Sequence, residues 1–116
     1  MAETFAPARL SADKAARYAE LRVQIASVPG HERDQMARMA TVSAMLSQAF
    51  DHYLWAGFYV VDPDRPDELV VGPYQGALGC LRIPFGRSVC GAAAARRTQV
   101  VPDVHAFPGH IACDSR

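Results

Sequence analysis

The chain of 116 residues has the size of one domain, with 50% hydrophobic and 21% charged residues, the profile of an ordinary globular domain. Its 12 basic and 12 acidic residues balance, so the composition gives no electrostatic footprint for nucleic acid or for an acidic membrane. The longest strongly apolar run, residues 54–61, is far shorter than the about 20 residues that cross a bilayer. The N-terminus also lacks the apolar core of a signal peptide. We therefore expect a cytoplasmic location, where cysteines rest as thiols.

Two helices are predicted in the first half of the chain, after an N-terminal tail over residues 1–10. Ser11 is the candidate cap of the first helix, Asp13 falls in its first turn, and Pro29 ends it. Apolar residues at three- and four-residue steps give this helix one stripe: Tyr18, Leu21, Ile25 and Val28. The second helix is predicted over about residues 32–50. Its expected buried side consists of Met36, Met39, Leu46 and Phe50.

From residue 53 the apolar pattern changes to a period of two, which predicts strands. A strand over residues 53–61, a turn over 63–67 and a strand over 68–74 should form an antiparallel hairpin. The remaining elements are a short strand over 80–83, a helix from Ser88 to residue 97 and a short strand over 99–101. We expect an α+β domain over residues 11–116, with its N-terminal helices packed on an antiparallel sheet. Because closing strands and a final helix do not follow, we expect this domain to be incomplete.

Three cysteines in the second half carry the main chemical signal. Cys90 lies near the start of a predicted helix, three residues after an arginine, and both features would lower the pKa of its thiol. Cys113 has His110 three residues before it, whereas the neighbouring Asp114 would oppose the thiolate. Cys80 lies in a strand-like stretch. These local arguments nominate Cys90 as the nucleophile, with burial as a small hydrophobic residue as the alternative for each cysteine.

A zinc site is another interpretation of the same region. Its candidate ligands are Cys80, Cys90, His105, His110 and Cys113. No Cys-x-x-Cys pair occurs, however, and the spacings match no common zinc module. His31 and His52 are expected at the surface or at helix ends. The sequence also contains no phosphate-binding loop, dinucleotide fingerprint or serine nucleophile motif.

The first strand carries an aromatic face. Trp55, Gly57 and Tyr59 alternate on it, and an indole, an empty position and a phenol would together form a shallow recess. Such a recess suits a small ligand with a methyl or thioether group, because sulfur and polarised methyl groups pack well on aromatic rings. Equally, these aromatic residues can face a layer of helices.

Four segments of the chain together resemble the family of free methionine-(R)-sulfoxide reductases, which are built on a GAF domain. The segments are residues 55–59, 69–76, 80–91 and 103–114. The resemblance covers about residues 11–116 and is strongest from Trp55 onward. It is specific because GAF domains in general share neither the three cysteines nor the His-Ile-Ala-Cys-Asp run that begins at His110.

The resemblance implies a redox enzyme that reduces free L-methionine (R)-S-oxide. The cysteine that matches Cys113 attacks the sulfoxide and becomes a sulfenic acid, and the one that matches Cys80 resolves it as a disulfide, with Cys90 as an alternative resolver. Thioredoxin restores the thiols, with no bound cofactor. The resemblance overrules the nomination of Cys90 as nucleophile. It also makes Trp55 and Tyr59 the expected walls for the S-methyl end of the substrate.

Family members continue for some 40 residues past the matching Cys-Asp, with strands, a helix and acidic residues that hold the substrate. Asp114 is the only matched acid near the expected nucleophile, so activity of this chain by itself stays open. The alternative functions are a GAF module that binds a small ligand or senses oxidants through its thiols, and a zinc-stabilised structural domain. Exposed sheet edges make a homodimer reasonable.

Overall fold

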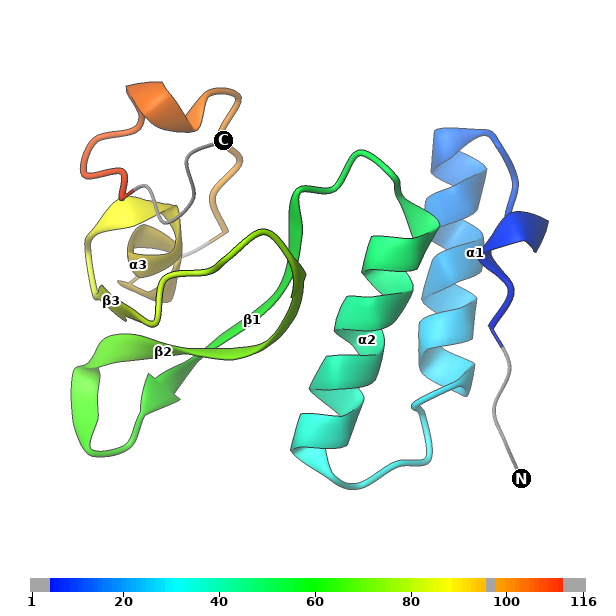
Figure 1. The fold of residues 1–116 in the computed structure, drawn as a ribbon, viewed down its shortest axis with the longest axis horizontal. Helices are drawn as coiled ribbons and strands as arrows, with labels where there is room; N and C mark the ends of the chain where they lie inside the picture. Colours follow the sequence, from blue (N-terminus) through cyan, green and yellow to red (C-terminus); the bar gives the residue numbers. More distant parts are fainter. Residues whose placement is uncertain (1–4, 96–97, 112–116) are drawn as a thin grey trace. The chain divides into compact units, whose positions relative to one another are not determined.

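The computed structural model describes residues 5–95 and 98–111 of the chain (Figure 1). The chain forms two compact units. The first contains Met1–Phe58 and Pro73–Gly76, and the second contains Tyr59–Gly72 and Ala77–Arg116. In the described part of the chain, no helix has the length and apolar character needed to cross a membrane.

The first unit contains the 3-10 helix η1 (Pro7–Arg9) and the helices α1 (Lys14–Ser27) and α2 (Gln35–Ala49). The carboxylate of Asp13 caps α1 by accepting the N–H of Ala16 at 3.0 Å, and Asp34 caps α2 in the same way. The prediction that Ser11 caps the first helix is therefore wrong. A carboxylate two residues later satisfies a backbone N–H and also matches the positive end of the helix dipole.

Helices α1 and α2 pack side by side around the core of the first unit (Figure 1). The buried core residues are Leu21, Met45, Ala49 and Phe50. Partly buried residues around this core are Phe5, Leu10, Ile25, Val28, Leu46 and Tyr53. The stripe predicted on α1 is thus confirmed at three of its positions, whereas Tyr18 is 40% exposed. Phe5 and Leu10, from the expected N-terminal tail, also pack here, and the boundary at residue 11 stays a prediction.

The buried side predicted for α2 is partly wrong. Met36 is 68% exposed, whereas Met45, which the prediction left out, is only 2% exposed. Apolar residues occur all round this helix, so their periodicity does not single out one face. Contact with α1 decides which residues are buried.

The sheet has three strands in the order β1-β2-β3: β1 (Trp55–Asp62), β2 (Arg65–Gly76) and β3 (Arg82–Pro84). The predicted hairpin is confirmed. Strand β3 pairs antiparallel with β2, and Leu69 lies opposite Ile83. The sequence predicted a strand over residues 80–83. Strand β3 begins at Arg82 instead, so Cys80 lies in the connection before the strand.

Helix α3 (Ser88–Ala95) and the 3-10 helix η2 (Val104–Ala106) complete the described elements. The strand predicted over residues 99–101 is wrong, because this stretch is irregular and the side chain of Val100 is 90% exposed. A β-branched pair needs a partner strand before its propensity takes effect, and no described strand pairs with it. The α+β class with an antiparallel sheet is confirmed.

Candidate active site

Cys80 is held through its main chain in the second unit. The hydroxyl of Tyr59, on β1, donates a hydrogen bond of 2.7 Å to the carbonyl oxygen of Cys80. The next carbonyl, that of Leu81, accepts the N–H of Val71 at 3.0 Å. The carbonyls of Cys80 and Leu81 are therefore held by residues of two strands, β1 and β2. Cys80 itself is half-buried and disulfide-bonded.

An ion cluster lies two residues after Cys80. The guanidinium of Arg82 pairs with the carboxylate of Asp62, at the end of β1, and with that of Glu68, on β2, at 3.2 Å. The hydrogen bond from Arg82 is the main cause that lowers the pKa of Asp62, and the N–H of Asp64 adds to it. In turn, the same bond raises the pKa of Arg82. This cluster ties β3 to both other strands, two residues after Cys80 in the sequence.

Cys90 is a half-buried thiol on α3 that forms no disulfide. Burial raises the pKa of this thiol, so the expectation of a lowered pKa is wrong. Desolvation disfavours the charged thiolate, and Arg87, whose proximity in sequence supported that expectation, is exposed to solvent. Cys90 is therefore less suited to be a nucleophile at neutral pH than the sequence indicated.

The loop that leads toward Cys113 is tied to the start of α3. The N–H of Ser88 donates to the carbonyl of Gly109 at 2.9 Å. Asp103 accepts the N–H of His105, and the His105 and His110 rings meet edge to face with centroids 5.5 Å apart. The predicted nucleophile Cys113 and the predicted substrate contact Asp114 lie outside the described residues.

The candidate zinc ligands do not gather in the described part of the chain. Over residues 5–95 and 98–111, no group of three or more His, Cys, Asp or Glu side chains could hold a metal ion. His31 and His52 are exposed, as expected.

The aromatic face of β1 is occupied by a residue that sequence reasoning missed. The ring of Tyr74, on β2, stacks on Trp55 with centroids 5.3 Å apart. A Cβ atom built on Gly57 would lie 2.3 Å from the Cβ of Tyr74, so the expectation of an empty position at Gly57 is wrong. A glycine inside an aromatic strand often marks such close approach of another backbone, and this signal could have found Tyr74.

A helix covers part of the same strand region. Ser43, on α2, is fully buried; its hydroxyl donates to the carbonyl of Met39 at 2.8 Å and also lies 3.2 Å from the carbonyl oxygen of Pro73. This contact places α2 against Pro73, the residue before Tyr74 on β2. The role of Trp55 and Tyr59 as substrate contacts stays a prediction.

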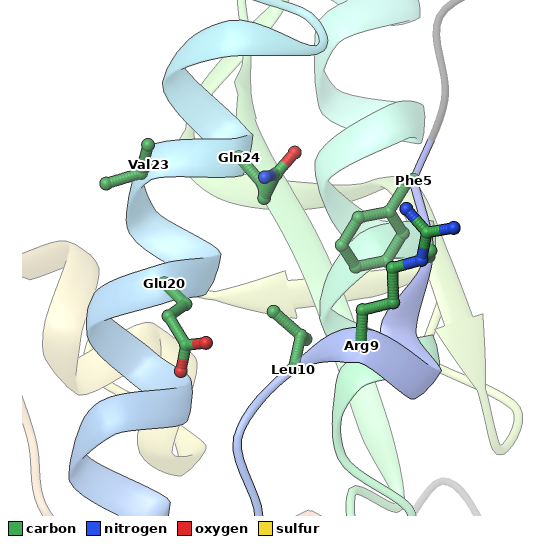
Figure 2. A pocket seen from close by; sticks show the side chains of 7 residues that line it. Phe5, Arg9, Leu10, Glu20, Val23 and Gln24 are labelled. Carbon is green, nitrogen blue, oxygen red and sulfur yellow. The ribbon is translucent and has the colours of Figure 1, made fainter.

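The first unit also has a hollow of about 370 Å³ between its N-terminal segment and α1 (Figure 2). Its lining residues are Phe5, Ala6, Arg9, Leu10, Glu20, Val23 and Gln24. The carboxylate of Glu20 already accepts the N–H of Ser11. None of the predicted site residues lines this hollow, so it is not a candidate for the redox site.

No family model matches the sequence, but individual proteins do. The chain is 44% identical over 99 residues to the free methionine-R-sulfoxide reductase of Escherichia coli, covering 84% of this chain and 58% of the relative. It is 54% identical to the crystallised free methionine-R-sulfoxide reductase of Neisseria meningitidis in complex with its substrate. That comparison has a TM-score of 0.84 and covers 90% of this chain and 62% of the other.

The fold agrees with these relatives. A solved structure described as a GAF domain is 31% identical, has a TM-score of 0.82, and is matched over 96% of this chain and 64% of its own. The GAF-like fold expected from the sequence is confirmed. The chain spans about three fifths of the length of the curated relatives it matches.

Proposed function

This chain belongs to the family of free methionine-R-sulfoxide reductases, and we propose that it carries the redox centre that reduces free L-methionine (R)-S-oxide to methionine. One observation within the chain carries the proposal. Cys80 is disulfide-bonded and held by hydrogen bonds to its main chain, whereas Cys90 is an unoxidised thiol with a raised pKa. This difference supports Cys80 as the resolving cysteine.

In the first step the thiol of Cys113 attacks the sulfoxide sulfur. The sulfur–oxygen bond of the substrate breaks, methionine leaves as a thioether, and Cys113 becomes a sulfenic acid that carries the oxygen and the thiol proton. The substrate sulfur is reduced by two electrons and the cysteine sulfur is oxidised by two. Trp55 and Tyr59 are proposed to contact the S-methyl end, because aromatic rings pack favourably against sulfur. Asp114 is the proposed acidic contact.

In the second step the thiol of Cys80 attacks the sulfenic sulfur of Cys113. A disulfide forms and one water molecule leaves. The dithiol of thioredoxin then reduces this disulfide by exchange and becomes oxidised itself. Cys90 is the alternative resolver, but burial lowers the share of its thiolate at neutral pH.

The proposal needs no bound cofactor, since the electrons pass through thiols from thioredoxin. It places the reaction in the cytoplasm, where a thioredoxin system keeps thiols reduced. We also propose that the chain forms a homodimer, because the edge strands of a sheet can pair with a second chain.

The test is the oxidation of NADPH by thioredoxin reductase, with thioredoxin, the purified chain and free methionine (R)-sulfoxide. Cys113→Ser should abolish turnover, and Cys80→Ser should lose most of it while still releasing methionine once. Cys90→Ser is the matched control, and a loss in this variant as large as that in Cys80→Ser would assign resolution to Cys90. Thiol oxidation without methionine release by the folded chain would instead support an oxidant-sensing module.

A further inference from the structure

We propose that Tyr59 is a positioning residue for Cys80: its hydroxyl holds the main chain of the resolving cysteine in the conformation that forms the disulfide. The inference rests on the proposed role of Cys80 as resolver. In this inference the hydroxyl of Tyr59 positions Cys80. The proposed function gives the ring of Tyr59 a different task, which is contact with the S-methyl end of the substrate.

The hydrogen bond has the ordinary length for a hydroxyl donor and runs from a side chain to the main chain. The Tyr59 hydroxyl lies 2.7 Å from the carbonyl oxygen of Cys80, across 21 residues of sequence. Cys80 is disulfide-bonded in the structure that shows this contact. The hydrogen bond therefore belongs to the oxidised state of Cys80, the state that the proposed resolving step would produce.

The side chains on either side of Cys80 are mostly exposed to solvent. Between β2 and β3, Ala77 is 7% exposed, but Leu78 and Leu81 are 68% and 75% exposed. Segments with little buried apolar surface open and move readily. The Tyr59 hydroxyl and the N–H of Val71 hold the two successive carbonyls at Cys80 and Leu81, so they restrict the main chain of the residue that carries the thiol.

A resolving thiol gains its rate from being held near its target. Fixing two reacting groups in one geometry turns their encounter into an intramolecular step with a high effective concentration. The step itself is the one given above, in which the Cys80 sulfur bonds to the sulfenic sulfur and water leaves. Tyr59 takes no part in the bonds that form or break.

The test compares Tyr59→Phe with Tyr18→Phe, using hydrogen peroxide as oxidant in place of methionine sulfoxide. Peroxide converts the reactive thiol to a sulfenic acid and water, and the sulfenic acid then reacts with the resolving thiol. Dimedone captures the sulfenic acid, and peptide mass spectrometry measures the disulfide at Cys80. Tyr18→Phe is the matched control, because it also removes one phenol hydroxyl from a hydrogen bond, to Tyr53 in the other unit.

We expect Tyr59→Phe to form the Cys80 disulfide about threefold to tenfold more slowly, the range for loss of one hydrogen bond, with more dimedone adduct. Tyr18→Phe should match the wild type, and circular dichroism should show both variants folded. Equal disulfide rates in Tyr59→Phe and wild type would overturn the positioning role and leave the reductase proposal standing. A slowed disulfide in a chain that releases no methionine would support positioning and reject the reductase. Absence of any Cys80 disulfide in wild type would overturn both the positioning role of Tyr59 and the assignment of Cys80 as the resolving cysteine.

Discussion

Gly57 and Tyr74 lie so close together that a side chain at residue 57 has no room. A Cβ atom there would be 2.6 Å from the Cα of Tyr74 and 2.8 Å from the carbonyl oxygen of Pro73. Because both of these neighbours are backbone atoms, strands β1 and β2 must move apart to accept alanine at residue 57. We expect Gly57→Ala to lower the free energy of unfolding by about 3 kcal/mol, measured by urea denaturation.

Gly86→Ala is the control for this prediction. Gly86 has a φ of +82° but nothing within 4 Å of its Cβ position. Alanine there meets only the cost of a left-handed backbone, about 1 kcal/mol. A smaller loss of stability in Gly57→Ala than in Gly86→Ala would contradict the close approach of Tyr74.

The hydroxyls of Tyr18 and Tyr53 are 2.5 Å apart, and both rings stack on Phe50. Burial, followed by the hydrogen bond and charge repulsion with Tyr18, raises the pKa of Tyr53 to about 12. The folded chain thus holds this proton more tightly than the unfolded chain. The resulting stabilisation is complete below pH 10, the unperturbed pKa, and is lost as the pH rises to about 12.

Tyr18→Phe should therefore lower the pKa of Tyr53 without returning it fully to its ordinary value, because burial is the larger cause. An alkaline titration of tyrosinate absorbance measures this shift. Tyr74→Phe serves as the control, since Tyr74 is not among the groups that shift Tyr53. An unchanged late-titrating tyrosine in Tyr18→Phe would argue against the hydroxyl pair.

Arg17 connects three segments of the first unit through one guanidinium. It donates to the carbonyls of Ala49 at 2.6 Å, Ser11 at 3.0 Å and Leu10 at 3.2 Å. A lysine has the charge but not the planar fork of donors. We expect Arg17→Lys to cost about 2 kcal/mol of stability, whereas Arg22→Lys, at an exposed position of the same helix, should leave urea denaturation unchanged. Equal effects at both positions would reject the role of Arg17.

The raised pKa of Cys90 predicts slow chemistry at its thiol. Since the thiolate is the reactive form, Cys90 in the reduced chain should be alkylated by iodoacetamide more slowly at neutral pH than an exposed thiol such as glutathione. The rate should increase as the pH rises above the ordinary range of thiol pKa values. Mass spectrometry of the Cys90 peptide measures this rate, and rapid labelling at neutral pH would show that burial does not control it.

Local sequence patterns predicted the elements that depend on local rules. The stripe of α1 and the β1–β2 hairpin follow from periodicity and a short turn. The same local patterns could not decide whether Ser11 or Asp13 caps α1, because serine and aspartate side chains can both accept a backbone N–H at the start of a helix. Nor could they select the buried face of α2, where the position of α1 decides that Met45, and not Met36, is covered.

The candidate site depended more on contacts distant in sequence. The cysteines and their family likeness were visible in the sequence, but the environment of each thiol was not. Helix position indicated a reactive Cys90, whereas its burial, which arises from tertiary packing, has the opposite effect. The hydrogen bond from Tyr59 to Cys80 joins residues on different elements, so no local pattern could predict it.

Methionine release in a single turnover tests the central claim most directly. The reduced chain is mixed with free methionine (R)-sulfoxide without thioredoxin, and methionine and remaining thiols are counted together. We predict about one methionine per chain, with the loss of the Cys113 and Cys80 thiols, and no methionine from Cys113→Ser. Folded wild-type chain that releases no methionine, or Cys113→Ser that releases as much as wild type, would contradict the account.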